Sequence, residues 1–197
     1  MRALPFVWPY ALVFWLAYLW SFASEYGIVS RGVEGVREAN SPDRGSLRLL
    51  LGGQMLALMV AIAVSAFKVW QFPARLLLPL FEVGTVLILL GSLLRRSCTR
   101  TLGEYFTGDV RTRSSQPVIR SGPYRLVRHP SYTGGMLIFV GIGLALGSVL
   151  GLLLLTVTTL VGYGYRVAVE ERALVAAVGE PYRIYMKECK RFIPYIV

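Results

Sequence analysis

The sequence predicts an all-α integral membrane protein with about five transmembrane helices. Of its 197 residues, 55% are hydrophobic and only 16% are charged, and the mean hydropathy is +0.56. Several apolar runs approach the roughly 20 residues that a helix needs to cross a bilayer. The formal charge is +10, but the basic residues lie between the apolar runs and not on one polar face. This pattern favours orientation in a membrane and attraction to anionic lipid headgroups over nucleic-acid binding.

The N-terminal half predicts three of these helices. The first covers residues 4–22 and carries tryptophan and tyrosine side chains that suit the membrane interface. It lacks a clear cleavage site, so we expect a lasting helix and not a signal peptide. The polar stretch EYGIVSRGVEGVREANSPDRGS follows and is expected to contain a short surface helix. The second and third helices cover residues 47–67 and 74–94, and the short connection KVWQFPA predicts that they form an antiparallel hairpin.

The C-terminal half predicts a tighter hairpin. Residues 131–147 and 148–165 are two apolar segments that meet near Gly147 and Ser148. Both segments are rich in glycine, which permits close packing of helix backbones or close approach of a backbone to a ligand. We therefore divide the chain into N-terminal transmembrane helices, residues 1–94 with loop 24–46, and a C-terminal region, residues 95–197. The C-terminal region comprises the connector 95–130, the hairpin 131–165 and the helices that follow it.

The distribution of basic residues predicts the orientation in the membrane. Arginine and lysine gather in three stretches, residues 24–46, 95–130 and 166–197, whereas the opposite side keeps only Arg2, Lys68 and Arg75. The positive-inside rule then places the N-terminus outside and both the connector and the C-terminus in the cytoplasm. Cys98 and Cys189 both fall in cytoplasmic segments and lack metal-type spacing, so we expect neither a structural disulfide nor a metal site.

Two polar clusters are thereby predicted on one side of the membrane. SGPYRLVRHPSY contains the only histidine, His129, at the entrance of a helix whose first turn accommodates Pro130. The start of a helix favours an anionic ligand group. YGYRVAVEERALVAAVGEPYRIY places Arg166 and Glu170 on one helix face, with Glu171 adjacent. Taken alone, His129 is explained as a histidine at a helix start that a nearby carbonyl satisfies. Arg166 and Glu170 alone are explained as a surface ion pair. Their convergence at one end of a hairpin indicates a functional site.

The order and spacing of these motifs resemble a known family. LGEYFTGDVRTRSSQPVIRSGPYRLVRHPSYTG and YRVAVEERALVAAVGEPYRIYMKECKRFIP contain the patterns G-x-Y-x-x-x-R-H-P-x-Y, R-x-x-x-E-E and G-E-x-Y-x-x-Y. Over residues 102–194 the chain resembles the isoprenylcysteine carboxyl methyltransferases, integral membrane enzymes with a cytosol-facing S-adenosyl-L-methionine site. The resemblance implies that S-adenosyl-L-methionine is the cofactor and that Arg166 and Glu170 are catalytic. It also implies a cofactor pocket walled by Pro117, Val118, Ile119, Gly122, Tyr124, His129, Pro130, Tyr132, Glu170 and Glu171.

One departure from the family concerns the residues before the Gly122 turn. Many relatives have a histidine there, whereas this chain has Ser114, Ser115 and Gln116. Whatever that histidine contributes is absent from this chain or is done differently.

The residue types suit methyl transfer to a carboxylate. A carboxylate is already ionised near neutrality, so the reaction needs alignment and a dry pocket but no general base. Arg166 can hold a carboxylate with its planar fork, and we expect it to face a lipophilic substrate that enters from the bilayer. An amine acceptor would need a base, for which His129 and Glu170 are the candidates.

Three alternatives to a carboxyl methyltransferase stay open on the sequence. They are a phospholipid or amine N-methyltransferase on the same fold, an NADPH-dependent sterol-type reductase, and a membrane scaffold without enzymatic activity. The identity of the methyl acceptor is open as well. Binding of S-adenosyl-L-methionine, of NADPH or of neither separates the classes.

Overall fold

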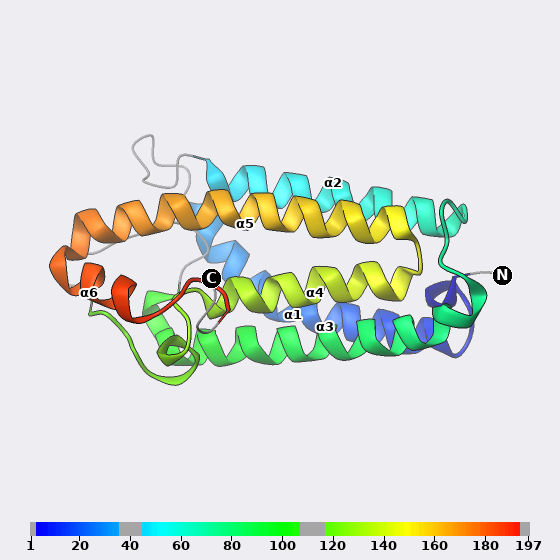
Figure 1. Ribbon diagram of the computed structural model, residues 1–197, viewed down its shortest axis with the longest axis horizontal. Coiled ribbons are helices and arrows are strands. Elements are labelled where there is room, and N and C mark those ends of the chain that lie inside the picture. The colour runs from blue at the N-terminus through cyan, green and yellow to red at the C-terminus, as the bar shows by residue number, and fades with distance from the viewer. Residues whose placement is uncertain (1–2, 36–44, 107–116, 194–197) are drawn as a thin grey trace.

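Apolar runs that end at proline, glycine and short polar turns fold into a bundle of helices. The computed structural model describes residues 3–35, 45–106 and 117–193 (Figure 1). The elements follow in this order: the 3₁₀ turn η1 (Leu4–Phe6), α1 (Tyr10–Gly35), α2 (Ser46–Ala66), α3 (Ala74–Leu102), η2 (Gly103–Tyr105), η3 (Gly122–Arg125), α4 (Pro130–Leu146), α5 (Val149–Val178) and α6 (Glu180–Glu188).

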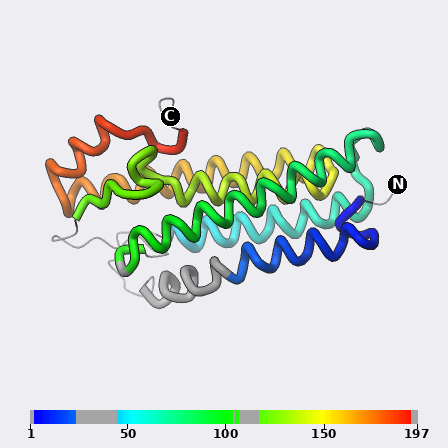
Figure 2. Tube along the Cα trace, turned by 90° about the horizontal axis from the view of Figure 1, so that it is seen from below, coloured from blue at the N-terminus to red at the C-terminus, as the bar shows by residue number. Residues whose placement is uncertain are grey.

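The predicted membrane bundle is confirmed. Within the described residues, α2, α3 and α5 are long and apolar enough to cross a membrane, and Tyr10–Ala23 and Pro130–Leu146 are shorter apolar helices. The large helices run along one common axis, and α6 with the C-terminal segment folds over one end of the bundle (Figure 2). We call this end the α6 end. The opposite end, made by residues 67–73 and 147–149, is the loop end.

The expected helix boundaries need correction at four places. The first helix begins at Tyr10 and not at residue 4, because the backbone is extended at Val7, which ends η1, and Pro9 could not donate a hydrogen bond inside a longer helix. It then continues unbroken to Gly35, where a separate surface helix was expected. α3 runs past residue 94 and α5 runs past residue 165. The backbone after each adopts positive φ at a glycine, Gly103 and Gly179, which ends a helix at little cost.

The predicted hairpin of the second and third helices is wrong, whereas that of α4 and α5 is confirmed. α2 packs along α5, and α3 packs along α4, with α4 and α5 in contact between them. The pairing of α3 with α4 follows from small residues, because a Cβ placed on Gly84 or Gly91 would collide with the backbone of α4. The short 67–73 connection lies instead on the α4–α5 turn, with Val149 N donating to Trp70 O (2.8 Å) and Phe72 N to Gly147 O (3.1 Å).

The core lies along the inner faces of these helices. Its fully buried large side chains come from α1, α3, α4 and α5 and include Phe14, Ile88, Ile142, Leu146 and Leu155. This rigid packing fixes the start of α4 beside the second half of α5 at the α6 end. The site described next is built there.

Candidate active site

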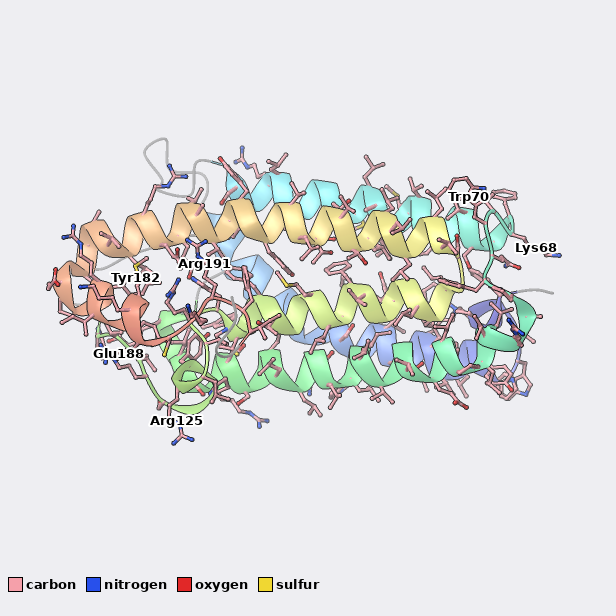
Figure 3. All side chains as sticks on the ribbon, viewed as in Figure 1. Lys68, Trp70, Arg125, Tyr182, Glu188 and Arg191 are labelled. Carbon is pink, nitrogen blue, oxygen red and sulfur yellow. The ribbon has the colours of Figure 1, made fainter. Side chains whose placement is uncertain are left out.

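The two polar clusters predicted from the sequence meet at the α6 end of the bundle. His129 at the start of α4 lies 3.3 Å from Glu171 on α5, measured between Nε2 and Oε1. One turn further along α4, the Tyr132 hydroxyl donates to Glu170 Oε2 at 2.7 Å. In Figure 3, Arg191, Tyr182 and Glu188 are labelled at this end, and Lys68 and Trp70 at the loop end. The expected convergence of the two clusters is therefore confirmed.

The local backbone explains how His129 is presented. Gly122 has φ +55° at the start of η3, and a side chain there would collide with Thr101. Tyr124 follows and is buried, and its carbonyl accepts a hydrogen bond from the Tyr185 hydroxyl of α6. His129 is then the N-cap of α4, with Pro130 at the first helical position, where a missing N–H is harmless.

Glu171 is the centre of a buried ionic cluster. Its side chain is only 5% exposed. Arg128 donates to Glu171 Oε1 from Nε at 3.0 Å, and Arg191 donates to Oε2 from Nη2 at 2.7 Å. The His129 ring nitrogen is the third partner, so both oxygens of this carboxylate are occupied by described side chains. Hydrogen bonding to Glu171 raises the pKa of Arg191, which keeps this arginine charged.

Glu170 belongs to a second, more open chain of contacts. Its side chain is 29% exposed, and its Oε2 accepts from Tyr132. The Tyr132 hydroxyl in turn accepts from Arg166 Nε at 3.3 Å, so it lies between the two charged groups predicted to be catalytic. Arg166 is 3% exposed and donates from Nη1 to Ser46 Oγ of α2 at 2.7 Å. The ring of Tyr163 lies 4.9 Å from that of Tyr132.

Buried ionisable groups are concentrated at this end. Among the described residues, Arg95, His129, Arg166 and Glu171 are buried, the side chain of Arg128 is only 8% exposed, and all five lie at the α6 end. Arg95 Nη1 donates to the carbonyl of Ser131 at 3.0 Å, which supports the first turn of α4 from α3. A buried charge lowers stability unless it is well paired, so such a concentration marks a site. No group of metal-binding side chains is found within the described part of the chain.

The remaining predicted residues lie nearby in a less buried segment. Pro117, Val118 and Ile119 have no regular secondary structure and are exposed or half-buried, shortly before η3. This segment is attached to α6 through Arg120, whose Nη1 donates to Glu188 Oε2 at 2.5 Å. Burial raises the pKa of Tyr124, so its hydroxyl stays protonated. The expected family departure at Ser114, Ser115 and Gln116 falls outside the described residues.

Three side chains of this site were not predicted from the sequence. Arg128 and Arg191 pair with Glu171, and Ser46 contacts Arg166. Arg128 could have been assigned to the site from the sequence, because it directly precedes His129 in the R-H-P motif. Arg191 was one of several basic residues in a basic tail, and Ser46 lies 120 residues from Arg166. Neither position can be assigned to the site from spacing alone.

Comparison with known proteins gives this geometry a context. A family model described as phospholipid methyltransferase matches residues 79–180, just over half of the chain. The chain is 29% identical over 154 residues to the protein-S-isoprenylcysteine O-methyltransferase of Schizosaccharomyces pombe, covering 75% of this chain and 62% of that protein. It is 30% identical over 116 residues to the Xenopus laevis protein of the same name, covering 58% of this chain and 40% of that protein. The predicted resemblance to isoprenylcysteine carboxyl methyltransferases is thus confirmed.

A solved structure shares the fold. It is the eukaryotic intramembrane Ras methyltransferase ICMT (isoprenylcysteine carboxyl methyltransferase), with a TM-score of 0.62 and 25% sequence identity over 73% of this chain. That match covers 51% of the other chain, so this chain spans about 40–62% of the length of the relatives named above. Because the family model matches more than half of the sequence, the chain belongs to the phospholipid methyltransferase family.

Proposed function

We propose that this protein is a membrane methyltransferase that transfers a methyl group from S-adenosyl-L-methionine to the carboxylate of a lipophilic, prenylcysteine-type acid. The observation that carries the proposal is the gathering of His129, Tyr132, Arg166 and Glu170 at one end of a bundle of bilayer-length helices. The names of the curated relatives support a carboxylate as the acceptor.

The side chains present fit the proposed cofactor. Glu170 has an accessible carboxylate, which can accept from hydroxyl and amino groups and complement a positive charge. The Tyr132 hydroxyl donates to this carboxylate, the ring of Tyr163 lies 4.9 Å from that of Tyr132, and aromatic faces attract a cation. S-adenosyl-L-methionine is a sulfonium with hydroxyl, amino and carboxylate groups, and when bound it supplies an electrophilic methyl group. A donor set of carboxylate, imidazole and aromatic rings is suited to hold such a molecule.

We assign different roles to the two adjacent glutamates. Glu170 is proposed to contact the cofactor directly, because part of its side chain is accessible. Glu171 is proposed to act on the pocket through His129, because its own oxygens already accept from Arg128, Arg191 and His129. Tyr132 is proposed to fix the positions of Glu170 and Arg166 relative to each other, because its hydroxyl hydrogen-bonds to both.

Arg166 is proposed to hold the substrate carboxylate. Its guanidinium is held by two hydrogen bonds, from Nε to the Tyr132 hydroxyl and from Nη1 to Ser46 Oγ. Arg166 is only 3% exposed, so a substrate carboxylate must displace one of the groups that now contact it. The carboxylate then forms a charged hydrogen bond in a site that excludes water. The acceptor oxygen is already anionic, so the chain needs to align it but not to remove a proton.

The remaining predicted residues are proposed to wall the pocket. Pro117, Val118, Ile119 and Gly122 would cover the cofactor from the connector, with Tyr124 anchoring that segment by its buried ring. Pro130 fixes the start of α4 beneath His129. We further propose that the α6 end faces the cytoplasm, because arginine and lysine are concentrated in the segments that meet there.

The proposal is tested by measuring methyl transfer from S-adenosyl-L-methionine carrying a labelled methyl group, with the purified protein in lipid nanodiscs. One acceptor is an S-farnesylcysteine acid and the other is phosphatidylethanolamine. We expect label in the farnesylcysteine as an ester, which base releases as methanol. Glu170→Gln should abolish it, and Glu180→Gln, at an exposed position on α6, should not. Base-stable label in phosphatidylethanolamine would show that the acceptor is an amine and not a carboxylate. The absence of transfer to either acceptor would contradict the proposed function.

A further inference from the structure

The last described residues of the chain form a strap over the start of α4. We define the C-terminal strap as residues 189–193. It runs beside residues 127–129 as one parallel bridge, with Arg128 N donating to Lys190 O at 2.8 Å and His129 N to Arg191 O at 3.0 Å. Figure 1 shows this segment turning back from α6 toward α4. The strap therefore holds the backbone of His129 directly.

The strap also reaches the side chain of His129 from two directions. The ring of Phe192 lies 6.3 Å from the imidazole, and the carbonyl of Phe192 accepts from Thr133 Oγ1 at 2.9 Å. Arg191 extends from the strap to Glu171, where its Nε and Nη2 both lie within 3.1 Å of Oε2. The imidazole contacts the other oxygen of the same carboxylate. Glu171 is thus shared between the strap and His129.

This sharing determines where the imidazole carries its proton. An ionised carboxylate can only accept hydrogen bonds, so the His129 nitrogen that contacts Glu171 must be a donor. That nitrogen is Nε2, at 3.3 Å from Oε1. The other ring nitrogen, Nδ1, lies 3.9 Å from Glu170 Oε2 on the side of the site that we assign to the cofactor. A fixed hydrogen bond on one nitrogen sets the tautomer and the orientation of the ring.

The orientation of Glu171 in turn depends on two arginines of unequal exposure. Arg128 is 8% exposed and also donates to the carbonyls of Met186 and Cys189, so it is part of the fold. Arg191 is 48% exposed, and its side chain contacts Glu171 through Nε and Nη2. Its shorter contacts are with Oε2, while Oε1, which also lies 3.3 Å from Arg191 Nε, faces the imidazole. Arg191 can therefore influence His129 without being needed to hold the bundle together.

We propose that Arg191 of the C-terminal strap is a positioning residue: it holds Glu171 so that Oε1 keeps the proton of His129 on Nε2 and turns Nδ1 toward Glu170. This rests on the proposed function only in taking the Glu170 side as the cofactor side. The guanidinium fork matters here, because two donors from one planar group fix the rotation of the carboxylate, whereas an ammonium supplies a point charge.

The test is nitrogen NMR of the histidine side chain in the full chain. His129 is the only histidine, so labelling histidine with ¹⁵N and purifying through a tag without histidine yields signals from one imidazole. Wild-type protein without cofactor should show the proton on Nε2. Arg191→Ala should populate the other tautomer, and Arg191→Lys should restore the wild-type pattern in part. Arg183→Ala is the matched control, because Arg183 is an exposed arginine of α6 paired with Glu180.

A second readout connects the tautomer to binding. Affinity for S-adenosyl-L-methionine should fall about tenfold in Arg191→Ala, the loss typical when a partner that orients a binding side chain is removed, and should be unchanged in Arg183→Ala. A wild-type imidazole protonated on Nδ1 alone would overturn the inference without any variant. An Arg191→Ala spectrum identical to wild type would overturn it as well. If wild-type protein binds no S-adenosyl-L-methionine, the proposed function fails, and the cofactor-free spectra still decide the role of Arg191.

Discussion

The two ends of the bundle solve the same structural problem with different chemistry. Both must join helix ends and satisfy their backbone groups. At the loop end, neutral groups are sufficient: Ser148 Oγ donates to Val69 O at 2.8 Å, and Ser65 Oγ donates to the Leu146 carbonyl. At the α6 end, the equivalent task is done by Arg128, Arg191, Glu171 and His129.

This difference indicates that the charges at the α6 end do more than join helix ends. A neutral hydrogen bond contributes about 1 kcal/mol, and the loop end shows that several of them are enough for a tight junction. A buried ion pair is often no more stabilising than an apolar replacement, and it becomes harmful when one partner is missing. Retaining Glu171 and Arg166 below 6% exposure is therefore best explained by a function that needs charge.

The largest effect should come from breaking the ionic cluster. Glu171→Ala leaves Arg128 and His129 buried without their carboxylate, and a loss of about 3–5 kcal/mol in the free energy of unfolding is expected for such a change. Thermal unfolding in detergent measures it. Glu188→Ala removes an exposed ion pair with Arg120 and serves as the control. Equal stability of the two variants would show that the α6 end is no more dependent on its charges than an ordinary surface.

The next largest effect concerns turnover and separates the acceptor classes. Arg166→Lys keeps the charge but loses the planar grip on a carboxylate, so turnover should fall on the order of a hundredfold at unchanged cofactor affinity. Parallel measurements of methyl transfer and S-adenosyl-L-methionine binding test this. If the acceptor is an amine, Arg166→Lys should reduce turnover only slightly. Near-normal turnover with a carboxylate acceptor would therefore remove Arg166 from the proposed role.

A smaller effect should separate packing from chemistry. A Cβ on Gly84 would collide with the backbone of Gly141 and Ala145, so Gly84→Ala should destabilise the α3–α4 contact by about 1–3 kcal/mol. Gly164→Ala is the control, because a Cβ there meets nothing within 4 Å. Unfolding measurements should show a loss in the first variant and none in the second. A neutral Gly84→Ala would mean that α3 and α4 are further apart than described.

The smallest effect should come from the loop end. Ser148→Ala removes the N-cap of α5 and the hydrogen bond to Val69 O, which should cost about 1 kcal/mol of stability. Cofactor affinity should stay at the wild-type value, because the change lies at the opposite end of the bundle. Thermal unfolding and a binding titration on the same sample provide both numbers. A lower affinity with intact fold would contradict the functional separation of the two ends.

The comparison also explains what the sequence could and could not predict. Hydropathy found the membrane helices, and the glycine-rich turn near Gly147 correctly predicted the α4–α5 hairpin. The long ends of α3 and α5 were missed because charged residues mark where a bilayer ends, whereas a helix continues until its backbone hydrogen bonding stops. Gly103 and Gly179 carried that second signal in the sequence. The false α2–α3 hairpin came from treating a short connection as evidence of packing.

The site was predictable where its residues are close in sequence. His129, Pro130 and Tyr132 share one helix start, and Arg166, Glu170 and Glu171 share one helix. Their meeting followed from the hairpin. The contacts of Ser46 and Arg191 depend on how α2 and the C-terminal strap pack against α5, and no periodicity in the chain encodes those long-range contacts. The sequence also could not distinguish the accessible Glu170 from the enclosed Glu171.

The central claim is that the polar groups at the α6 end bind S-adenosyl-L-methionine, and a calorimetric titration of the purified protein tests it most directly. We expect saturable binding of S-adenosyl-L-methionine and none of NADPH. His129→Ala and Glu170→Ala should each weaken the affinity at least about tenfold, or about 1.4 kcal/mol, while the bundle remains folded. Binding of NADPH in its place, or wild-type affinity for S-adenosyl-L-methionine in both variants, would contradict the claim.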